Sequence, residues 1–381
     1  MHNCLVCDAA QLTEFSGFGE FMRITSDEQP YRRGGKLWIC EACGAVQKLV
    51  DLQFLTEIGE IYAKYATFQK SDGDEQIVFD QRSGSLRRRS AILIERILET
   101  LALADTGSML DIGCGNGVTL KAFGECLPGW ALFGQEMDSR SAEILRRLPG
   151  FKQLYTCTPA TVPGRYGLIS LVHTLEHFLD PAALLRGLAD RLDADALLFV
   201  QVCNLEANPF DLLIADHLLH FTPSTLLRLA QKAGFGAHIS ATDWVPKEIS
   251  ALLVADEGAA SQLFEPAALA RPRVEKHLSW LGQLEASARA KLYGHTSRGL
   301  FGSTIAATWL GSALEDSIDF FVEEDPSRCG KQLLQKPILH PRDVPDGAGV
   351  FLGLAPLTAK KIHARLCNEK FQLILPPEYD A

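Results

Sequence analysis

Long apolar stretches are absent from this sequence of 381 residues. The longest apolar runs, such as residues 196–200, are a handful of residues, whereas a membrane-spanning helix needs about 20. The first residues, MHNCLVC, lack the basic and apolar regions of a secretory signal peptide. Low-complexity segments and internal repeats are missing as well. We therefore expect a folded, cytoplasmic protein that has no membrane partner.

An excess of positive charge is also absent. The chain has 37 Lys and Arg residues against 47 Asp and Glu residues, which gives a formal net charge of −10. This balance argues against a protein held on nucleic acid by phosphate contacts. One basic cluster, Arg87 to Arg89, falls on a predicted helix and is either a solvated face or an anion site. Three consecutive helical positions point in different directions, which favours the solvated face.

The length predicts two or three domains rather than one. We place an N-terminal metal-binding module at residues 1–50 and a helical lead-in plus a central α/β domain at 51–258. Residues 259–381 read as a linker helix followed by a second, smaller α/β domain. Nothing in the sequence sets an oligomeric state.

Four of the ten cysteines are paired in sequence, as Cys4 with Cys7 and Cys40 with Cys43. Two C-x-x-C pairs predict a tetrahedral zinc site, and Gly44 permits the tight turn that such sites use. Four thiolates leave no open coordination position, so the metal would be structural. The alternatives are four incidental buried cysteines or a redox-active pair.

A glycine-rich turn follows the predicted strand at residues 108–112, in the segment MLDIGCGNGVTL. A phosphate-binding P-loop ends in lysine and serine or threonine, and this run offers no lysine or serine in place. The dinucleotide fingerprint G-x-G-x-x-G needs a glycine where the chain has Val118. What remains is the pattern D-x-G-x-G-x-G, formed by Asp111, Gly113, Gly115 and Gly117.

The carboxylate ahead of these glycines indicates the kind of ligand. Asp111 would repel a pyrophosphate, but it can orient the loop and meet a cationic group. S-adenosylmethionine carries an ammonium and a sulfonium group, and glycines let the backbone approach it without Cβ clashes. Glu136 ends the next predicted strand and is placed to bind both ribose hydroxyls. Asp138 is its rival for that role.

Several segments resemble class I S-adenosylmethionine-dependent methyltransferases: LDIGCGNG, GQE, LISLVHTLEHFLDP and LLFVQVCN. The resemblance implies a Rossmann-like sheet, in agreement with the alternating strands and helices predicted here. It also implies that His173 lines the cofactor pocket. The expected cofactor contacts are Asp111, Gly113, Cys114, Gly115, Gly117, Glu136 and His173.

The three-part layout resembles the zinc-containing methyltransferases that methylate carbon atoms of nucleotide-linked deoxysugars. This resemblance implies a nucleotide-linked sugar as the small-molecule substrate, and it places a histidine base at His217. Asp216 stands where that family has glutamate, and Ile214 replaces its tyrosine, which removes a hydroxyl group. An O- or N-methyltransferase of another small molecule is the alternative, as is a zinc- and cofactor-binding interaction protein without catalysis.

Methyl transfer requires that the enzyme position the acceptor and remove its proton, and histidine is the natural base near neutral pH. The candidate catalytic residues are His217, Asp216 and His177. His217 could instead brace the following turn, and His177 could begin a helix. Upstream, Tyr62, Tyr65 and Phe68 recur at helical spacing and form either core or a lid.

A glycine turn in the C-terminal part precedes a predicted helix. Its backbone amides, with Ser297 and Arg298, could receive an anion such as the pyrophosphate of a nucleotide sugar. A turn with only a packing role is the alternative. The candidate substrate residues are Gly294, Ser297 and Arg298.

Overall fold

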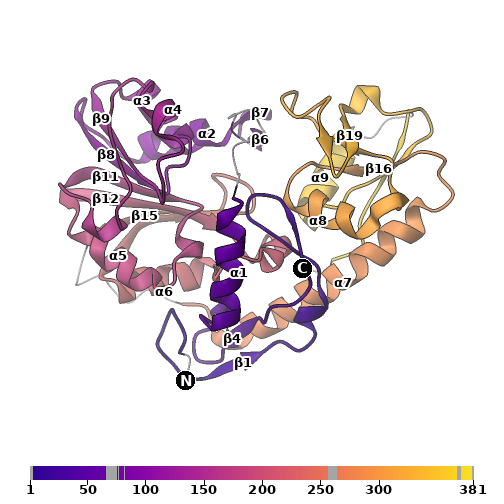
Figure 1. Cartoon of the computed structure of the whole chain (residues 1–381), viewed down its shortest axis with the longest axis horizontal. Helices are drawn as coiled ribbons and strands as arrows, with labels where there is room; N and C mark the ends of the chain where they lie inside the picture. Colours follow the sequence, from indigo (N-terminus) through magenta and orange to yellow (C-terminus); the bar gives the residue numbers. More distant parts are fainter. Residues whose placement is uncertain are drawn as a thin grey trace.

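The computed structural model describes residues 3–65, 75, 77–80, 82–255, 264–366 and 370–379. Two α/β lobes stand side by side, and the N-terminal segment, drawn in indigo, lies between them (Figure 1). One lobe contains a sheet of seven strands and the other a sheet of six. This arrangement confirms the predicted α/β class with a second α/β unit. None of the described helices has the length and apolar character needed to cross a membrane.

The seven-stranded sheet has the order β10-β9-β8-β11-β12-β15-β14. Its first five strands run parallel, while β15 is antiparallel to both of its neighbours. The strands are β8 (Gly107–Ile112), β9 (Trp130–Gln135), β10 (Phe151–Tyr155), β11 (Tyr166–Val172), β12 (Leu192–Cys203), β14 (Phe235–Ala241) and β15 (Glu248–Ala255). The strands expected near residues 108, 130, 167 and 196 are all present, whereas β10, β14 and β15 were not predicted.

Helices connect these strands, and two of them begin at the predicted N-cap residues. The Asp180 side chain accepts a hydrogen bond from the Ala183 amide, and Thr222 forms a capping box with Thr225. The helix expected over residues 139–148 is reduced to a single turn. The helices are α2 (Arg89–Thr100), α3 (Val118–Cys126), α4 (Ala142–Leu145), α5 (Pro181–Ala189) and α6 (Pro223–Lys232).

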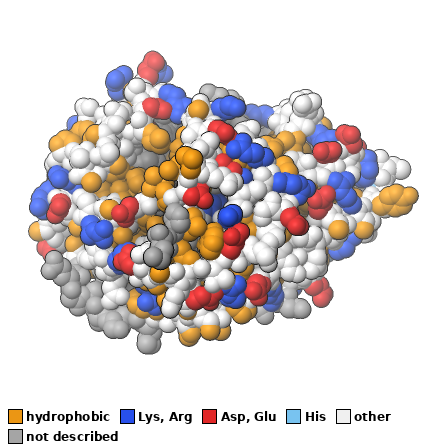
Figure 2. All heavy atoms as spheres, turned by 60° about the horizontal axis from the view of Figure 1, so that its bottom comes forward, with side chains coloured by type: hydrophobic (Ala, Val, Ile, Leu, Met, Phe, Trp, Pro, Cys, Tyr) orange, Lys and Arg blue, Asp and Glu red, His pale blue; other side chains and the backbone are white. Residues whose placement is uncertain are grey.

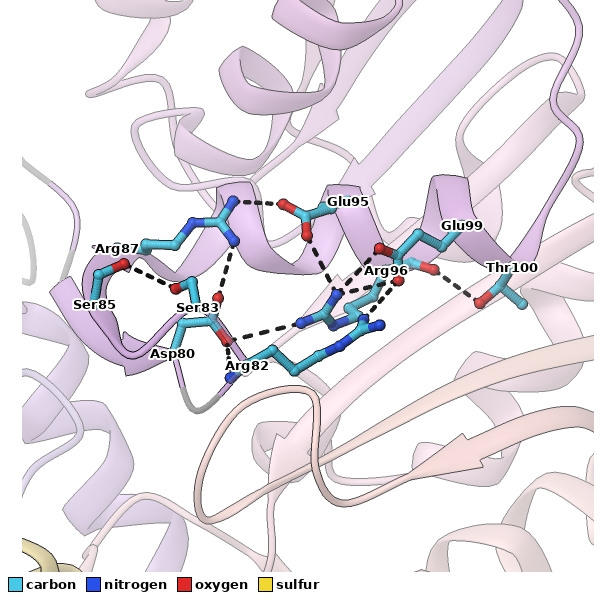
Figure 3. Close-up of polar contacts among 9 residues, drawn as sticks. All are labelled: Asp80, Arg82, Ser83, Ser85, Arg87, Glu95, Arg96, Glu99 and Thr100. Atoms are coloured by element: carbon cyan, nitrogen blue, oxygen red, sulfur yellow. Dashed lines mark hydrogen bonds and ion pairs between the residues drawn. The ribbon is translucent and has the colours of Figure 1, made fainter.

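A hairpin of β6 (Ile77–Asp80) and β7 (Ser85–Arg88) is fixed to α2 by ion pairs (Figure 3). Asp80 is buried and lies 3.0 Å from an Arg87 nitrogen and 3.7 Å from an Arg96 nitrogen. The other terminal nitrogen of Arg87 lies 2.5 Å from the carboxylate of Glu95 on α2. The carboxylate of Asp80 thus joins the hairpin to the helix through two cations.

The arginine cluster at residues 87–89 does not lie on one helix, contrary to the prediction. Arg87 and Arg88 belong to β7, and α2 begins only at Arg89. Arg89 is directed to another partner, since its guanidinium lies 3.5 Å from Glu248. With Arg87 and Arg89 each paired to a carboxylate, the three residues form neither a common solvated face nor a common anion site.

The N-terminal segment forms a small sheet in the order β1-β4-β5-β13. Three of its strands come from that segment, but β13 (Leu219–His220) comes from the segment between β12 and β14 of the central sheet. The N-terminal part is therefore built into the central domain by strand pairing. Its elements are β1 (Leu12–Glu14), β2 (Arg23–Ile24), β3 (Pro30–Tyr31), β4 (Trp38–Cys40), β5 (Val46–Gln47) and α1 (Leu52–Ala63).

The C-terminal lobe begins with the long helix α7 and has the strand order β18-β19-β17-β16-β20-β21. All pairs in this sheet are parallel except β18 with β19. The elements are α7 (Ala270–Leu292), β16 (Arg298–Phe301), α8 (Ile305–Leu314), β17 (Phe320–Val322), β18 (Gln332–Leu333), β19 (Lys336–Leu339), β20 (Gly349–Phe351), α9 (Pro356–Leu366) and β21 (Gln372–Ile374).

An apolar cluster joins all three parts of the chain. Ile24 of the N-terminal segment and Ile214 of the central domain share it with Trp280 on α7 and Leu310 on α8. The indole of Trp309 also donates a hydrogen bond of 2.8 Å to the Met22 carbonyl. The residues just before His217 are consequently enclosed by both lobes.

Candidate active site

The glycine turn after β8 adopts a conformation that favours glycine. Gly113, Gly115 and Gly117 have φ values of 68°, 51° and 84°. A Cβ atom on Gly113 would lie 2.6 Å from the Thr174 hydroxyl, and one on Gly117 would collide with Leu145. The turn therefore lies directly against the segment that follows β11.

Glu136 closes the turn from the end of β9. Its carboxylate accepts hydrogen bonds from the Gly115 amide at 3.0 Å and from the Met137 amide at 2.7 Å. Asp138, the alternative candidate for binding the ribose hydroxyls, forms an ion pair of 2.6 Å with Arg140 instead. Of the two acids, only Glu136 contacts the glycine turn among the described interactions.

Asp111 and Cys114 have side chains buried beside this turn. The Ser170 hydroxyl donates to Asp111 at 2.5 Å, and burial raises the pKa of that carboxyl to about 7. The Cys114 side chain packs in the apolar core next to Gly134. The backbone of Cys114, rather than its thiol, is thus the part available to a ligand in the turn.

His173 lies between two carboxylates at the end of β11. Its Nε2 is 3.1 Å from Glu248, and its Nδ1 is 3.4 Å from Glu176. Burial alone would lower the pKa of His173, but the charge of Glu248 leads the effects that raise it well above the usual value. The residue has a positive φ of 49°, which is uncommon outside glycine and marks a constrained turn.

Glu176, His177 and His217 form a compact cluster beside this turn. One ligand atom of each lies within 4.8 Å of those of the others. Glu176 is only 1% exposed, yet among the described residues neither of its carboxylate oxygens has a hydrogen-bond partner. A buried carboxylate of this kind is costly unless a donor reaches it, so the cluster suits a ligand that carries hydroxyl groups.

Asp211 binds two histidines at once. It lies in the 3-10 helix η4 (Pro209–Leu213) and accepts hydrogen bonds from His217 Nδ1 at 2.7 Å and His220 Nδ1 at 2.8 Å. Burial would lower the pKa of His217, but the hydrogen bond and charge of Asp211 raise it overall. The bond to Nδ1 leaves Nε2 as the nitrogen that can exchange a proton with an acceptor.

Asp216, the predicted acidic partner in catalysis, has a different set of contacts. Its carboxylate accepts hydrogen bonds from the backbone amide and the hydroxyl of Ser26, at 2.9 and 2.5 Å. It also lies 3.5 Å from His177 Nδ1. Asp216 therefore fastens the N-terminal segment to the cluster, while Asp211 is the carboxylate bonded to His217.

His177 is held in one orientation by its neighbours. Its Nδ1 lies 3.1 Å from the Asp216 carbonyl and 3.2 Å from the Tyr62 hydroxyl. Burial, followed by the charge of His217, lowers the pKa of His177. Because a carbonyl only accepts, Nδ1 carries the proton and Nε2 the lone pair. Of the proposed aromatic stripe, Tyr62 thus reaches the cluster, and Phe68 lies outside the described residues.

The four N-terminal cysteines converge as predicted. Cys4 and Cys43 sulfur atoms are 3.6 Å apart, as are those of Cys7 and Cys40, and all four lie within 4.8 Å of one another. Tetrahedral Zn–S bonds of about 2.3 Å put sulfur atoms about 3.8 Å apart. The Val6 amide points to the Cys4 sulfur at 3.4 Å, and Gly44 makes the tight turn with a φ of 77°. These residues fit a tetrahedral metal ion.

The predicted anion loop of the C-terminal lobe is placed differently from the expectation. Gly294 and Ser297 precede strand β16, and the following helix begins only at Ile305. Arg298 lies 3.5 Å from Asp319, and its amide donates to the same carboxylate. The helix N-terminus on which the prediction depended is therefore absent at this turn. The chain continues as a strand because residues 299–301 are buried between β17 and β20.

Charged side chains of both signs are interspersed on the face shown in Figure 2, and hydrophobic side chains gather between them. The face presents no broad area of one charge. A nucleic-acid backbone would therefore meet acidic as well as basic groups on this face.

Comparison with known proteins identifies the central part of the chain. Residues 85–238 match the family model described as "Methyltransferase domain". Residues 85–238 form a methyltransferase domain. The glycine turn and the cluster around His217 both lie within this region, at the carboxyl-terminal ends of its parallel strands.

Relatives of this methyltransferase domain include proteins named "Ubiquinone biosynthesis O-methyltransferase". The one from Bordetella parapertussis is 27% identical over 137 residues, which is 33% of this chain and 56% of that protein. The one from Leptothrix cholodnii is 22% identical over 150 residues, 36% of this chain and 63% of that protein. The chain thus spans little more than half the length of the curated relatives it matches.

A solved structure with a similar domain is the 1,6-didemethyltoxoflavin-N1-methyltransferase of Burkholderia thailandensis. It aligns with a TM-score of 0.41 and 15% identity, over 56% of this chain and 96% of that one.

Sequence reasoning missed two residues of the site. No sequence pattern indicates that Asp211 binds His217. Whether Asp211 or Asp216 faces that imidazole depends on the turn of η4. Lys48 looks like an ordinary charged residue after a strand, yet it is buried beside the His217 segment. Only the pairing of β5 with β13 brings it there.

Proposed function

We propose that this chain transfers a methyl group from S-adenosylmethionine to a small acceptor, with His217 as the base. One observation carries the proposal: Thr174 touches the glycine turn and stands two residues before Glu176. The glycine turn, which would hold the methyl donor, and the histidine cluster are therefore adjacent at the carboxyl ends of the parallel strands. Parallel α/β sheets bind their ligands at this end.

Residues of the turn would hold the cofactor. The glycines and the Cys114 backbone leave room for the methionine and ribose parts, Glu136 would bind the ribose hydroxyls, and His173 and Asp111 would border the pocket. The bound cofactor supplies a methyl group that its sulfonium has already activated. The protein then has to orient the acceptor and take up its proton.

The Asp211–His217 pair suits proton removal. His217 Nδ1 is committed to Asp211, so the acceptor proton would pass to Nε2, and Asp211 stabilises the imidazolium that forms. His177, whose Nε2 keeps its lone pair, would accept a hydrogen bond from the same acceptor. Asp216 would act through its hold on Ser26 and not as the base.

For the acceptor we propose a carbohydrate, carried on a nucleotide, with methylation at carbon or oxygen. The Glu176 carboxylate lies 3.4 Å from His173 and beside two further histidines, but it accepts no hydrogen bond among the described residues, so this position suits a ligand rich in hydroxyl groups. Carbon methylation in the resembled family uses a tyrosine where this chain has Ile214, and Ile214 is buried in the cluster that joins the lobes. The Tyr62 hydroxyl, which lies 3.2 Å from His177 Nδ1, is a tyrosine hydroxyl that this chain places at the site.

Methylation at oxygen is the second candidate. It is favoured by the sequence relatives named O-methyltransferases, and it needs only the base, since a hydroxyl proton is removed in a single step. Glu176 and the histidines serve this reaction equally well.

We also propose that the four N-terminal cysteines bind Zn²⁺ as a structural ion. The sulfur geometry fits the tetrahedral set, and four thiolates leave no position for a substrate. The ion would hold the turn that precedes β1 to the turn between β4 and β5.

A screen with ¹³C-methyl-labelled S-adenosylmethionine tests the function. Nucleotide-linked sugars and phenolic compounds are offered as acceptors, and NMR locates the new methyl group. We expect label on a sugar, with turnover lost in His217→Ala and retained in His238→Ala, whose histidine is exposed on β14. Label found only on phenolic oxygen would overturn the sugar assignment, and full turnover in His217→Ala would overturn the base.

A further inference from the structure

Lys48 is a buried cation in the middle of the protein. It follows β5 directly and is only 3% exposed. Burial, followed by the charge of Arg23, lowers the pKa of its ammonium group to about 7, against the opposing effects of Asp216, Asp211 and Glu57. A lysine in such a position needs partners for its three donors.

The partners are backbone carbonyl groups of a single segment. Lys48 Nζ donates to the carbonyls of Ala215 at 3.1 Å and His217 at 2.6 Å, and also to that of Ile214. The backbone amide of Lys48 donates to the Leu218 carbonyl at 2.8 Å. One residue of the N-terminal segment thus holds four carbonyls within residues 214–218.

The remaining carbonyl of that segment completes the pattern. The Asp216 carbonyl accepts from His177 Nδ1 at 3.1 Å. All five carbonyls of residues 214–218 are therefore fixed, four by Lys48 and one by a histidine of the cluster. The segment carries both Asp216 and His217, so its backbone sets where those two side chains point.

We propose that Lys48 is a positioning residue that fixes the 214–218 segment and, through it, the orientation of His217 and His177. Lys48 does not touch the acceptor or the cofactor turn, and it acts only through these carbonyls. It stands five residues after Cys43, directly after the strand that leaves the cysteine cluster. The N-terminal segment thereby supports the histidines directly. The proposal rests on the proposed function for its catalytic consequence but not for its structural content.

The test compares the wild-type chain with Lys48→Met, which keeps the length of the side chain and removes its donors. The matched control is Lys232→Met, because Lys232 also binds the N-terminal segment, through the Leu5 carbonyl at 3.2 Å and Asp8 at 2.7 Å. It has no contact with residues 214–218 among the described interactions. Amide hydrogen exchange and the ring NMR signals of labelled histidines are measured in all three proteins.

We expect at least about a tenfold faster exchange of the Ala215 and Leu218 amides in Lys48→Met, with shifted ring signals of His177 and His217. Lys232→Met should leave both readouts as in the wild type. Unchanged exchange and unchanged histidine signals in Lys48→Met would overturn the proposal. If Lys48→Met does not fold, Lys48→Gln is measured instead. Its amide has two donors for three carbonyls, so faster exchange is still expected, and unchanged exchange and histidine signals would overturn the proposal.

A binding measurement separates this proposal from the proposed function. Calorimetry with S-adenosylhomocysteine should give affinities within about twofold in the wild type and Lys48→Met, because the cofactor turn has no contact with Lys48. Absence of binding in the wild type would defeat the proposed function, while the exchange and NMR results would still decide the role of Lys48.

Discussion

At the scale of single residues, the site depends on how one carboxylate is shared. Asp211 is bonded to His217 and His220 together, and this pairing makes His217 a stronger base than an isolated histidine. The sequence predicted His217 and Glu136 because each stands at a motif position. It selected Asp216 in place of Asp211, since both acids flank the same turn and only the folded backbone shows which one faces the imidazole.

Replacing Asp211 by Asn tests this pairing. His217 must be neutral to act as a base, so wild-type kcat should rise as the pH increases through its raised pKa, above the usual value of about 6.5. Asp211→Asn removes the charge that raises this pKa. We expect the rise to move to lower pH and kcat to fall by about 100-fold or more.

NMR titration of the histidines measures the pKa of His217, and the pH profile of turnover measures the change in kcat. The imidazole signals of His217 report its pKa directly, without an acceptor. An Asp211→Asn variant whose His217 titrates at the wild-type pH would contradict the pairing.

At the scale of elements, local patterns predicted most of the central sheet and its caps. Strand β10 was missed because "FKQLY" lacks both alternation and a long apolar run, and it forms as an edge strand beside β9. The predicted linker helix is present as α7, but the glycine turn after it was expected to precede a helix and leads into strand β16 instead. Packing decides this, because residues 299–301 are buried between β17 and β20 of their own sheet.

The cysteine cluster offers a prediction at this scale. Cys43→Ser removes one of four thiolates, and we expect the bound zinc to fall well below one per chain and the free energy of unfolding to drop by about 3 kcal/mol or more. Elemental analysis and urea denaturation measure the two effects. Cys126→Ser is the control, since that thiol is exposed and outside the cluster. Equal zinc content in the two variants would refute the metal site.

At the scale of the whole molecule, the N-terminal segment and the C-terminal lobe both close around residues 204–222. Strand β13 pairs with β5, the Ile24 carbonyl accepts from the Ala215 amide at 2.7 Å, and the His277 side chain on α7 binds the Leu205 carbonyl at 2.8 Å. The sequence predicted the three parts but not these contacts, because strand pairs and buried hydrogen bonds between distant segments leave no periodic signal. The candidate active site therefore depends on contacts among all three parts of the chain.

His277 gives this junction a pH dependence. Burial lowers its pKa to about 4, whereas in the unfolded chain it is about 6.5. The unfolded state therefore binds a proton first, and stability should fall as the pH drops from about 6.5 to 4, by about 3 kcal/mol. His277→Gln can still donate to Leu205 and should lose most of this dependence in urea denaturation at the two pH values. The same slope in both proteins would show that His277 is not responsible.

The central claim is that the glycine turn after β8 binds S-adenosylmethionine. Calorimetric titration with S-adenosylhomocysteine tests it most directly, using the wild type, Gly115→Arg and the control Gly84→Arg. Both glycines have a positive φ, 51° at Gly115 and 68° at Gly84, so the backbone strain of the substitution is matched. The Gly115 amide donates to Glu136, whereas a Cβ on Gly84 would meet no atom within 4 Å. We predict saturable binding at one site per chain in the wild type and Gly84→Arg, and none in Gly115→Arg. Equal binding in all three proteins, or none in the wild type, would contradict the account.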